Sequence, residues 1–404
     1  MSDGSDGSDR SDRSNISPPV AHHGFGVRVM PFEYFSGHFS QIKGLFYLGK
    51  PINSTNFTFL ITTIAKEKMA KKILITGAGG FIGGFIVAEA LSRGYETWAA
   101  VRATTSLQFL TDPRINFIEL DFTEPDDLHT TLKEHIEKNG KWDYVVHNLG
   151  ATKCINFNMF QTINCDYMKL LVETLRDLDA VPEVFLMMSS LSVMGQGDDK
   201  NYTPFSSKSI PFPNTFYGVS KFNAESYLRS IADFPYIIFR CTGVYGPHER
   251  DYYLMMKSIK MGFDFTVGFK KQMLTFIYVK DLATAVLDSL EHGAARKAYF
   301  ISEPRGYTQN EFRKIVARKL GKRLVLPVKC PLWVVKIVCR VAETIGTLTM
   351  KPSTLNADKF KIMKQRNWLC DTSEAQADFG FAPKYDLEKG VKEAIDWYRS
   401  AGWL

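Results

Sequence analysis

The chain of 404 residues contains little cysteine and no long apolar run. Its six cysteines are far apart and form no C-x-x-C pair, so we expect no metal site, no dense disulfide framework and a reducing, cytoplasmic location. No stretch reaches about 18 uninterrupted apolar residues, so no transmembrane span is expected. The net charge is +7, but lysine and arginine are scattered and form no dense basic run, which argues against a nucleic-acid partner.

The first 68 residues differ in composition from the rest of the chain. The opening stretch is rich in Ser, Asp and Gly and has too few apolar side chains to fold, and residues 21–68 show no clean hydrophobic period. We predict that residues 1–68 are a disordered or non-native extension and that folding begins near Met69.

Glycines dominate the turn Thr76–Gly83, which separates a strand-like segment from a helix-like one. This order of strand, glycine-rich turn and helix is typical of a site for the diphosphate of a dinucleotide. Gly77 permits the tight turn, Gly80 lets the backbone approach the diphosphate, and Gly83 lets the helix pack close to the strand. The N-terminus of that helix adds N–H donors and a partial positive charge.

Strand-like and helix-like segments alternate from Met69 onward, which predicts a parallel sheet with helices on both faces. The expected strands are Lys72–Thr76, Glu96–Val101, Asn116–Leu120, Tyr144–His147, Val184–Ser189 and Tyr236–Arg240, and the helices between them include Asp126–Glu137 and Phe160–Leu175. After residue 241 the pattern is irregular, with returns to the sheet expected at Phe276–Tyr278 and Ala298–Ile301. The predicted fold is therefore α/β, with a Rossmann-type doubly wound parallel sheet in an NAD(P)-binding domain at 69–240 and a smaller, mixed substrate lobe at 241–404.

Tyr217 and Lys221 are four residues apart, so they lie one turn from each other on the same face of a predicted helix. A phenol has a pKa of about 10, and a neighbouring ammonium together with an oxidised nicotinamide would lower that pKa toward the range of acid–base catalysis. Ser190 closes the fifth strand, where it either steadies a substrate oxygen or belongs to a serine-rich turn. Asn164 either satisfies buried backbone or shapes its helix and holds a proton-relay water.

Together these motifs resemble the extended short-chain dehydrogenase/reductase family, also called the NAD-dependent epimerase/dehydratase family. The resemblance covers residues 72 to about 400, and its motifs are TGAGGFIG, Asp121-Phe122, His147–Ala151, SSLSVMG, YGVSK, and Arg240 with Gly243–Pro247. It implies that Tyr217 is the catalytic acid or base and that Lys221 binds the nicotinamide ribose and lowers the tyrosine pKa. It also implies that Ser190, five residues before Gly195, holds the substrate oxygen and that Asn164 completes a tetrad.

The resemblance also assigns the cofactor contacts. They are Gly77, Gly80, Phe81, Ile82 and Gly83 at the diphosphate, Asp121 and Phe122 near the adenine, and Leu149, Gly150 and Ala151 at the end of the fourth strand. At the end of the second strand, where NAD-preferring sites carry an acidic residue for the ribose 2′-OH, this chain has Arg102. A guanidinium suits a 2′-phosphate, which favours NADP over NAD, although Arg102 could instead stack on the adenine of either cofactor.

The motif after the sixth strand distinguishes branches of the family. Nucleotide-sugar members carry an Asn three residues after the motif arginine, whereas this chain has Gly243 three residues after Arg240. That glycine and the stretch Ala298–Ser302 are similar to 3β-hydroxysteroid dehydrogenases and dihydroflavonol reductases. The implied activity is hydride transfer to or from a secondary alcohol or ketone of a small, apolar, steroid- or flavonoid-like substrate. The alternatives are a nucleotide-sugar 4-epimerase or dehydratase and a non-catalytic dinucleotide-binding sensor.

One helix pattern in the lobe is strongly apolar. In Pro331–Leu348 the charges Lys336, Arg340 and Glu343 form one polar stripe, which predicts a helix packed in the core. The alternatives are a helix that lines an apolar substrate pocket or one that makes a peripheral contact with a membrane surface. Asp281 is expected to cap the helix that follows it, or else to order the substrate lobe. The resemblance further implies that the chain forms a homodimer, as is common in the family.

Overall fold

The computed structural model describes residues 70–349 and 353–404. The predictions for residues 1–68 and for a start of folding near Met69 lie outside the described residues. The chain from Ala70 to Leu404 forms a single compact unit.

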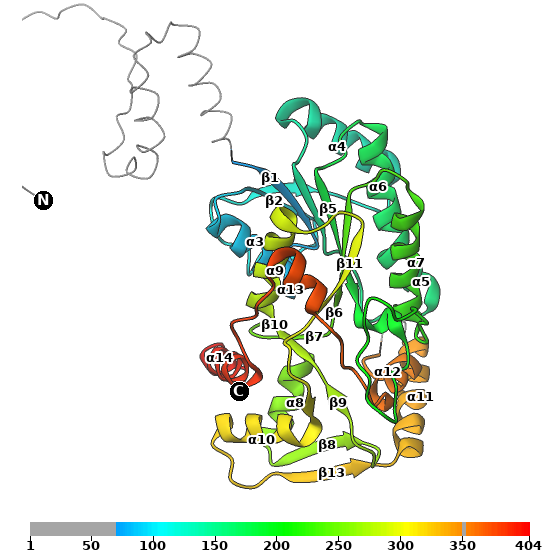
Figure 1. The fold of residues 1–404 in the computed structure, drawn as a ribbon, viewed down its shortest axis with the longest axis vertical. Coiled ribbons are helices and arrows are strands. Elements are labelled where there is room, and N and C mark those ends of the chain that lie inside the picture. The colour runs from blue at the N-terminus through cyan, green and yellow to red at the C-terminus, as the bar shows by residue number, and fades with distance from the viewer. Residues whose placement is uncertain (1–69, 350–352) are drawn as a thin grey trace, which may run out of the picture. The chain divides into compact units, whose positions relative to one another are not determined.

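A seven-stranded sheet forms the centre of this unit, and every strand in it is parallel to its neighbours (Figure 1). Its strands are β1 (Lys72–Thr76), β2 (Glu96–Val101), β3 (Asn116–Glu119), β4 (Tyr144–His147), β5 (Val184–Ser190), β6 (Tyr236–Cys241) and β11 (Lys297–Ile301). They lie in the order β11-β6-β5-β4-β1-β2-β3, so the strand order reverses between β1 and β4. The predicted α/β fold with a Rossmann-type sheet is confirmed, and ligands of such sheets bind at the reversal point, beside the carboxyl ends of the strands.

Helices cover both faces of the sheet because its strands are apolar on both sides. Alternate residues of β1 point to opposite faces, so Ile73 and Ile75 pack into one core cluster and Leu74 packs into another. The first face is covered by α3 (Phe81–Ser92), α9 (Val279–His292) and α13 (Ser373–Phe379). The second face is covered by α4 (Pro125–Asn139), α6 (Tyr167–Asp177) and α7 (Phe216–Ser230), as Figure 1 shows.

Of the two expected returns to the sheet, one is confirmed and the other is wrong. Ala298–Ile301 lies in β11, which pairs with β6 at the edge of the sheet. Phe276–Tyr278 forms β10, but this strand pairs with β7 (Gly243–Tyr245) in a separate two-stranded sheet. All three residues of β10 are buried, and a short buried apolar run carries no signal for which sheet it joins.

The lobe is built around aromatic side chains rather than around a large sheet. Its core cluster includes Tyr245, Phe276, Phe312 and Tyr398. Its remaining elements are α8 (Asp251–Lys260), β8 (Phe263–Val267), β9 (Met273–Leu274), β12 (Tyr307–Thr308), α10 (Gln309–Leu320), β13 (Leu326–Cys330), α11 (Leu332–Leu348), α12 (Ala357–Lys364) and α14 (Leu387–Ser400). β8 pairs with β13 in parallel, and β9 pairs with β12 in antiparallel orientation.

Asp281 does not cap α9, because that helix begins two residues earlier, at Val279. The Asp281 carboxylate instead accepts hydrogen bonds from the backbone N–H groups of Lys384 (3.0 Å) and Tyr385 (2.9 Å). It therefore ties α9 to the segment that precedes α14. The capping prediction is wrong, and the alternative, a role in ordering the lobe, agrees with these contacts.

α11 is a surface helix, so the prediction that it packs in the core is wrong. Cys339 and Gly346 are buried, but Trp333 is 67% exposed and Ile337 is 54% exposed. A hydrophobic period identifies an apolar helix without saying what covers each face, which is why the sequence misleads here. None of the helices in the described part of the chain is long and apolar enough to cross a membrane.

Candidate active site

The glycine turn brings three elements into backbone contact at the reversal point of the sheet. Gly77 has a φ of 66°, and a Cβ on it would lie 2.9 Å from the carbonyl oxygen of Asn148, which follows β4. A Cβ on Gly83 would overlap the Gly77 carbonyl oxygen, so only glycine lets α3 approach β1 this closely. The side-chain amide of Asn148 donates to that same carbonyl (3.3 Å) and fixes the end of β4 against the turn.

The N-terminus of α3 is available to an anion. Gly80 is the N-cap residue, it is exposed, and it gives the helix no side-chain cap. The first turn, which begins with Phe81 and Ile82, contains no acidic residue that would repel or replace an anion. The free N–H groups and the dipole of the helix therefore fit a diphosphate in this cradle.

The end of β4 meets two of the predicted tetrad residues. A Cβ on Gly150 would lie 2.9 Å from both the Lys221 Nζ and the Asn164 Oδ1 atoms. Lys221 comes from α7 and Asn164 from the segment before α6. The fold thus brings both side chains to the segment Leu149–Ala151. Gly150 is itself exposed, which leaves this junction open at the edge of the sheet.

Asn164 is fully buried and lies in a π-helical turn, Thr162–Asp166, between α5 (Phe157–Gln161) and α6. Its Oδ1 accepts from the Ala151 N–H (2.8 Å), and its Nδ2 donates to the Ala151 carbonyl (3.0 Å) and to the Ser220 hydroxyl (3.0 Å). The single helix expected at Phe160–Leu175 is thus interrupted where this amide reaches across to the end of β4. π-turns are often found at functional sites, and here the turn aims the amide at the backbone beside Lys221.

The two serines at the end of β5 have different surroundings. The Ser189 hydroxyl donates to Glu225 (2.6 Å), which is fully buried and paired with Arg240 (2.7 Å). The Ser190 hydroxyl accepts from the Ser192 N–H (3.1 Å), so it caps a short 3₁₀ helix at Leu191–Met194. Ser189 therefore belongs to an internal ion-pair network, and Ser190 is the serine that faces the tyrosine.

Tyr217 lies in the first turn of α7, whose N-cap residue Thr215 accepts from the Gly218 N–H (3.0 Å). Burial raises the pKa of Tyr217 to about 12, while the hydrogen bond with the Ser190 side chain acts in the opposite direction. The protein groups alone thus raise this pKa, whereas the motif predicts that Lys221 and an oxidised nicotinamide lower it. Burial, Ser190 and Cys241 account for the pKa of the phenol, and the Lys221 ammonium donates to the Met188 carbonyl (2.9 Å).

Burial lowers the pKa of Lys221 to about 8, because its ammonium is almost completely removed from water. His147 lies nearby at the end of β4, and burial followed by the charge of Lys221 lowers its pKa to about 3. The histidine is therefore neutral at neutral pH, and its Nδ1 atom pairs with the Thr76 hydroxyl (3.2 Å). Of the Lys221 amine and the His147 imidazole, only the lysine is therefore charged at neutral pH.

The predicted adenine end lies at the carboxyl ends of β2 and β3. Arg102 is exposed. The Thr105 N–H donates to the Arg102 carbonyl (2.8 Å), and the Thr105 side chain lies against the glycine turn. The N–H and hydroxyl of Thr123 lower the pKa of Asp121, with a smaller effect from Arg102. Phe122 is buried and its ring stacks on Tyr167 (5.5 Å between centroids), so its side chain belongs to the core beneath this end.

Asp358 of α12 is a contributor that sequence reasoning missed. Its carboxylate accepts from the backbone N–H groups of Phe216 (2.5 Å) and Tyr217 (3.2 Å), which places a negative charge at the N-terminus of α7. Asp358 and Tyr217 are 141 residues apart, and nothing in the local sequence predicts the contact. The lobe thus helps to hold the helix that carries the tyrosine.

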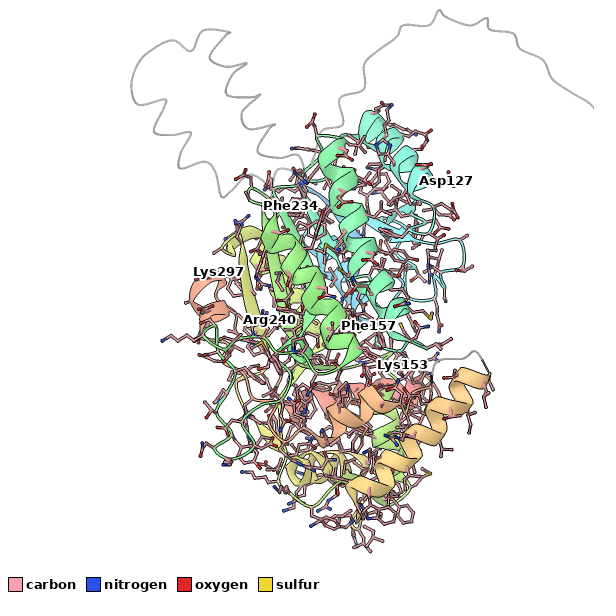
Figure 2. All side chains as sticks on the ribbon, turned by 90° about the vertical axis from the view of Figure 1, so that its right-hand side faces the viewer. Asp127, Lys153, Phe157, Phe234, Arg240 and Lys297 are labelled. Carbon is pink, nitrogen blue, oxygen red and sulfur yellow. The ribbon has the colours of Figure 1, made fainter. Side chains whose placement is uncertain are left out.

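Two further contacts hold the loop after β4 to the lobe. Lys153 of that loop pairs with Asp251 of α8 (2.8 Å), and Asp251 also pairs with Lys359 of α12 (3.2 Å). Figure 2 shows Lys153 and Phe157 beside the lower end of α7, above the α11 ribbon. The Phe157 ring lies 5.5 Å from that of Phe216, so α5 packs against the start of α7.

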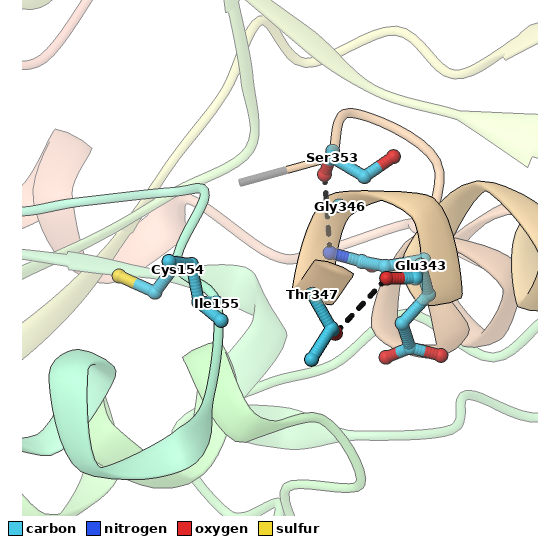
Figure 3. A pocket seen from close by; sticks show the side chains of 7 residues that line it. Cys154, Ile155, Glu343, Gly346, Thr347 and Ser353 are labelled. Carbon is cyan, nitrogen blue, oxygen red and sulfur yellow. Dashed lines mark hydrogen bonds between the residues drawn. The ribbon is translucent and has the colours of Figure 1, made fainter. Parts of the chain in front are cut away.

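A small cavity marks the seam between this loop and α11. It is lined by Cys154 and Ile155 of the loop, by Glu343, Gly346 and Thr347 of α11, and by Ser353 and Asn356 before α12 (Figure 3). Its volume of about 10 Å³ leaves room for one water molecule at most. The seam is thus a packed contact and not a substrate pocket.

Comparisons with known proteins agree with this geometry. The model of the NAD dependent epimerase/dehydratase family matches residues 73–302. The ceramide reductase of Caulobacter vibrioides is 24% identical over 82% of this chain and 96% of its own length. The decarboxylating sterol-4-alpha-carboxylate 3-dehydrogenase of Dictyostelium discoideum is 22% identical over 80% of this chain and 99% of its own length.

Solved structures share the fold. The UDP-glucose 4-epimerase of Thermotoga maritima, solved with UDP-glucose, superposes with a TM-score of 0.65 at 21% identity and covers 82% of this chain and 99% of its own. Other similar structures contain NAD or NADPH. At this level of identity the likeness concerns the fold alone.

Proposed function

Because the chain belongs to the NAD dependent epimerase/dehydratase family, we propose that it is an NAD(P)-dependent oxidoreductase acting on a secondary alcohol or ketone of an apolar substrate. The observation that carries the proposal is the junction at Gly150, where Lys221 and Asn164 meet one helical turn from Tyr217. The glycine cradle at Gly77 and Gly83 fits the diphosphate of the cofactor. The bound nicotinamide supplies the carbon that gives or receives the hydride.

The residues around the junction have separable roles in this proposal. Tyr217 gives or takes the hydroxyl proton of the substrate, and Ser190 holds the same oxygen. Lys221 supplies a positive charge that favours the phenolate once its ammonium turns from the Met188 carbonyl toward the cofactor ribose. Asn164 is a positioning residue, because its amide fixes the end of β4 on which Lys221 rests.

The lobe favours an apolar substrate over a nucleotide sugar. A Cβ on Gly243 would overlap the Tyr252 hydroxyl, so this phenol fills the space into which the Asn of nucleotide-sugar members would project. The named activities of two relatives, a ceramide reductase and a sterol dehydrogenase, also concern lipids. We therefore assign a lipid-like or polycyclic ketone or alcohol, such as a steroid, a flavonoid or a long-chain acyl compound.

A nucleotide-sugar 4-epimerase or dehydratase is the second candidate, favoured by relatives that are named UDP-glucose 4-epimerase and dTDP-D-glucose 4,6-dehydratase. The two candidates differ in cofactor balance. A dehydrogenase changes the amount of reduced nicotinamide in proportion to product, whereas an epimerase or dehydratase returns the hydride to its own substrate.

The cofactor preference is proposed to be NADP. Arg102 is exposed at the end of β2, where its guanidinium can reach a 2′-phosphate, and Asp121 is a neighbouring carboxylate whose charge it partly balances. Arg102→Ala should weaken NADPH binding by roughly tenfold or more and leave NADH binding nearly unchanged. Equal losses for both cofactors would show that Arg102 stacks on the adenine instead.

The test of the proposed function is a substrate panel with both cofactors. Steroid ketones, N-acylated long-chain ketones and flavanonols are each incubated with the full chain and NADPH or NADH, and UDP-glucose is incubated with the full chain and NADP⁺ or NAD⁺. Reduced cofactor and product are measured together. Net oxidation of the cofactor with an apolar ketone supports the proposal. Conversion of UDP-glucose without net cofactor change supports the second candidate, and dinucleotide binding without any turnover supports a sensor.

A further inference from the structure

Exposed apolar side chains gather on adjoining elements at one end of the lobe, and we call this surface the apolar face. It consists of the outward sides of α11 and of the β8–β13 pair with the adjoining loops. Its exposed members are Met261, Phe263, Phe265, Phe269, Leu324, Leu326, Leu332, Trp333, Ile337, Val338, Val341, Ile345 and Leu348. Monomeric proteins rarely expose this much adjoining apolar surface without a partner.

α11 contributes a stripe along its outer side. Trp333, Ile337, Val341 and Ile345 follow one another at intervals of four residues, so they share one face of the helix. Each of these side chains is more than half exposed. The opposite side packs on α12, which leaves the stripe directed away from the protein.

The β8–β13 pair extends the same surface. Asp264 points inward, where Gln309 of α10 donates to it (3.2 Å), so its neighbours Phe263 and Phe265 point outward. Leu326 of β13 pairs in register with Phe263, which gives the outer side of both strands an apolar character. β13 ends at Cys330 and α11 begins at Leu332, so the two parts of the face adjoin.

The charges around the apolar face are mostly basic. The exposed basic residues of its segments are Lys257, Lys260, Lys270, Lys271, Lys322, Arg323, Lys329, Lys336 and Arg340. Within residues 257–271 and 319–348 the acidic residues are Asp264, which is buried, and Glu343, which is half-buried at the seam with the loop after β4. A second copy of this chain would therefore bring one cationic surface against another.

We propose that the apolar face docks on the surface of an anionic lipid bilayer. A bilayer interface accepts aliphatic and aromatic side chains below the headgroups and binds lysine and arginine through its lipid phosphates. Trp333 and the phenylalanines suit the boundary between headgroups and acyl chains. Docking would be parallel to the surface, with α11 lying in the interface rather than crossing it.

Such docking would bring the candidate active site close to lipid. α11 packs on α12, and Asp358 of α12 holds the N-terminus of α7, where Tyr217 lies. An apolar substrate would then have a short path from the membrane. The docking inference stands on the surface alone and does not depend on the proposed function.

The test is co-sedimentation of the full chain with vesicles of phosphatidylcholine alone and of phosphatidylcholine mixed with phosphatidylglycerol. Wild type should bind the anionic vesicles more strongly than the neutral ones and should lose that advantage in high salt. The double variant Ile337→Glu/Val341→Glu and the single variant Phe265→Glu should each weaken binding by roughly tenfold or more. Lys336→Gln/Arg340→Gln should weaken it by roughly fivefold for each lost cation, and only on anionic vesicles.

Phe117→Glu is the matched control, because Phe117 is 41% exposed on β3 at the far edge of the sheet and Phe265 is 58% exposed on β8. It should bind vesicles like wild type, and circular dichroism should show every variant folded.

Absence of vesicle binding by wild type, or equal binding by the control and the apolar-face variants, would overturn the proposal. Loss of self-association in the Glu variants without any vesicle binding would also overturn it, in favour of a second copy as the occupant. Turnover plays no part in these readouts, so failure here is distinct from failure of the proposed function.

Discussion

At the scale of single residues, Lys221 is an ammonium kept inside the protein. Its side chain is almost fully buried, and burial lowers its pKa from the ordinary 10.5 to about 8. A lowered pKa for a base means that the folded state disfavours the charged form. This charge therefore destabilises the fold below pH 8, and the effect disappears as the pH rises from about 8 to 10.5.

Replacing Lys221 should reveal this effect. Lys221→Met removes the buried charge and the hydrogen bond to the Met188 carbonyl, so the free energy of unfolding at neutral pH should rise by about 2 kcal/mol. Denaturant titration at a series of pH values measures the difference from wild type. The gain should shrink between pH 8 and 10.5. A variant that is less stable than wild type at every pH would show that the lysine is not desolvated as described.

Gly83 and Gly84 are adjacent glycines of α3 with opposite surroundings. A Cβ on Gly83 would meet the Gly77 carbonyl, whereas a Cβ on Gly84 would make ordinary contacts at 3.8 Å or more. Gly83→Ala should lower the free energy of unfolding by roughly 2 kcal/mol or more and abolish dinucleotide binding, because the turn must move. Gly84→Ala, the matched control, should be neutral or more stable by about 0.5–1 kcal/mol. Calorimetry and cofactor titration measure both, and normal cofactor binding by Gly83→Ala would contradict the close approach.

Much of the candidate site could be predicted from residue types alone, because a glycine-rich turn, a serine run and Tyr-x-x-x-Lys in this order have few purely structural explanations. The sequence could not foresee that Ser189 is engaged by Glu225, nor that burial raises the pKa of Tyr217. Both depend on side chains that surround the residue in space. The roles assigned to Ser190, Tyr217, Lys221 and Asn164 stay predictions until variants are measured.

At the scale of elements, α7 and β6 are joined by a buried ion pair. Burial by itself would raise the pKa of Glu225, but Arg240, Arg229 and the Ser189 hydroxyl together hold it below its ordinary value. Arg240 is buried, while the Arg229 side chain is 36% exposed. The same carboxylate thus has one internal and one surface partner.

The two arginines should differ sharply in their effect on stability. Arg240→Met leaves Glu225 without its buried partner and should lower the free energy of unfolding by about 3–5 kcal/mol. Arg229→Met, the control, should lower it by about 1 kcal/mol or less. Because the native pKa of Glu225 is lowered, wild type has this stabilisation at neutral pH and loses it as the pH falls below about 4.5. Equal losses for both variants would place the stabilising pair at the surface.

The boundaries of β1, β2 and β4 follow from the sequence because buried parallel strands are short apolar runs bounded by turns. Three other features of the fold do not follow from the sequence. The π-turn at Asn164 depends on an amide bonding to Ala151, the pairing of β10 depends on β7, and the exposure of α11 depends on what packs beside it. Each is decided by contacts between distant parts of the chain, which periodicity does not record.

At the scale of the whole molecule, the lobe holds the tyrosine-bearing helix through Asp358. Asp358→Ala removes an acceptor from two backbone N–H groups and a charge from the helix N-terminus, so it should lower the free energy of unfolding by about 1–2 kcal/mol. It should also lower kcat, since Tyr217 donates one of those bonds. Asp358→Asn keeps an acceptor oxygen and should restore most of both losses. Full activity in Asp358→Ala would show that the lobe does not position α7.

The overall α/β architecture was within reach of the sequence, since alternating strands and helices with a glycine turn allow few arrangements. The arrangement of the lobe could not be predicted from the sequence, because its aromatic core and its contacts to α7 join segments more than a hundred residues apart. The proposed substrate class rests on side chains of that lobe, such as Tyr252 beside Gly243, which is why the sequence predicts a class of chemistry and not a compound.

The most direct test of the central claim compares Tyr217→Phe with wild type, using the most active substrate of the panel. The exchange removes one hydroxyl and leaves the ring, so dinucleotide binding should stay within about twofold of wild type. The rate of hydride transfer, followed by the absorbance of the reduced nicotinamide, should fall by about 10²–10⁴-fold. A Tyr217→Phe variant that turns over at nearly the wild-type rate would contradict the assignment of this phenol as the group that moves the proton.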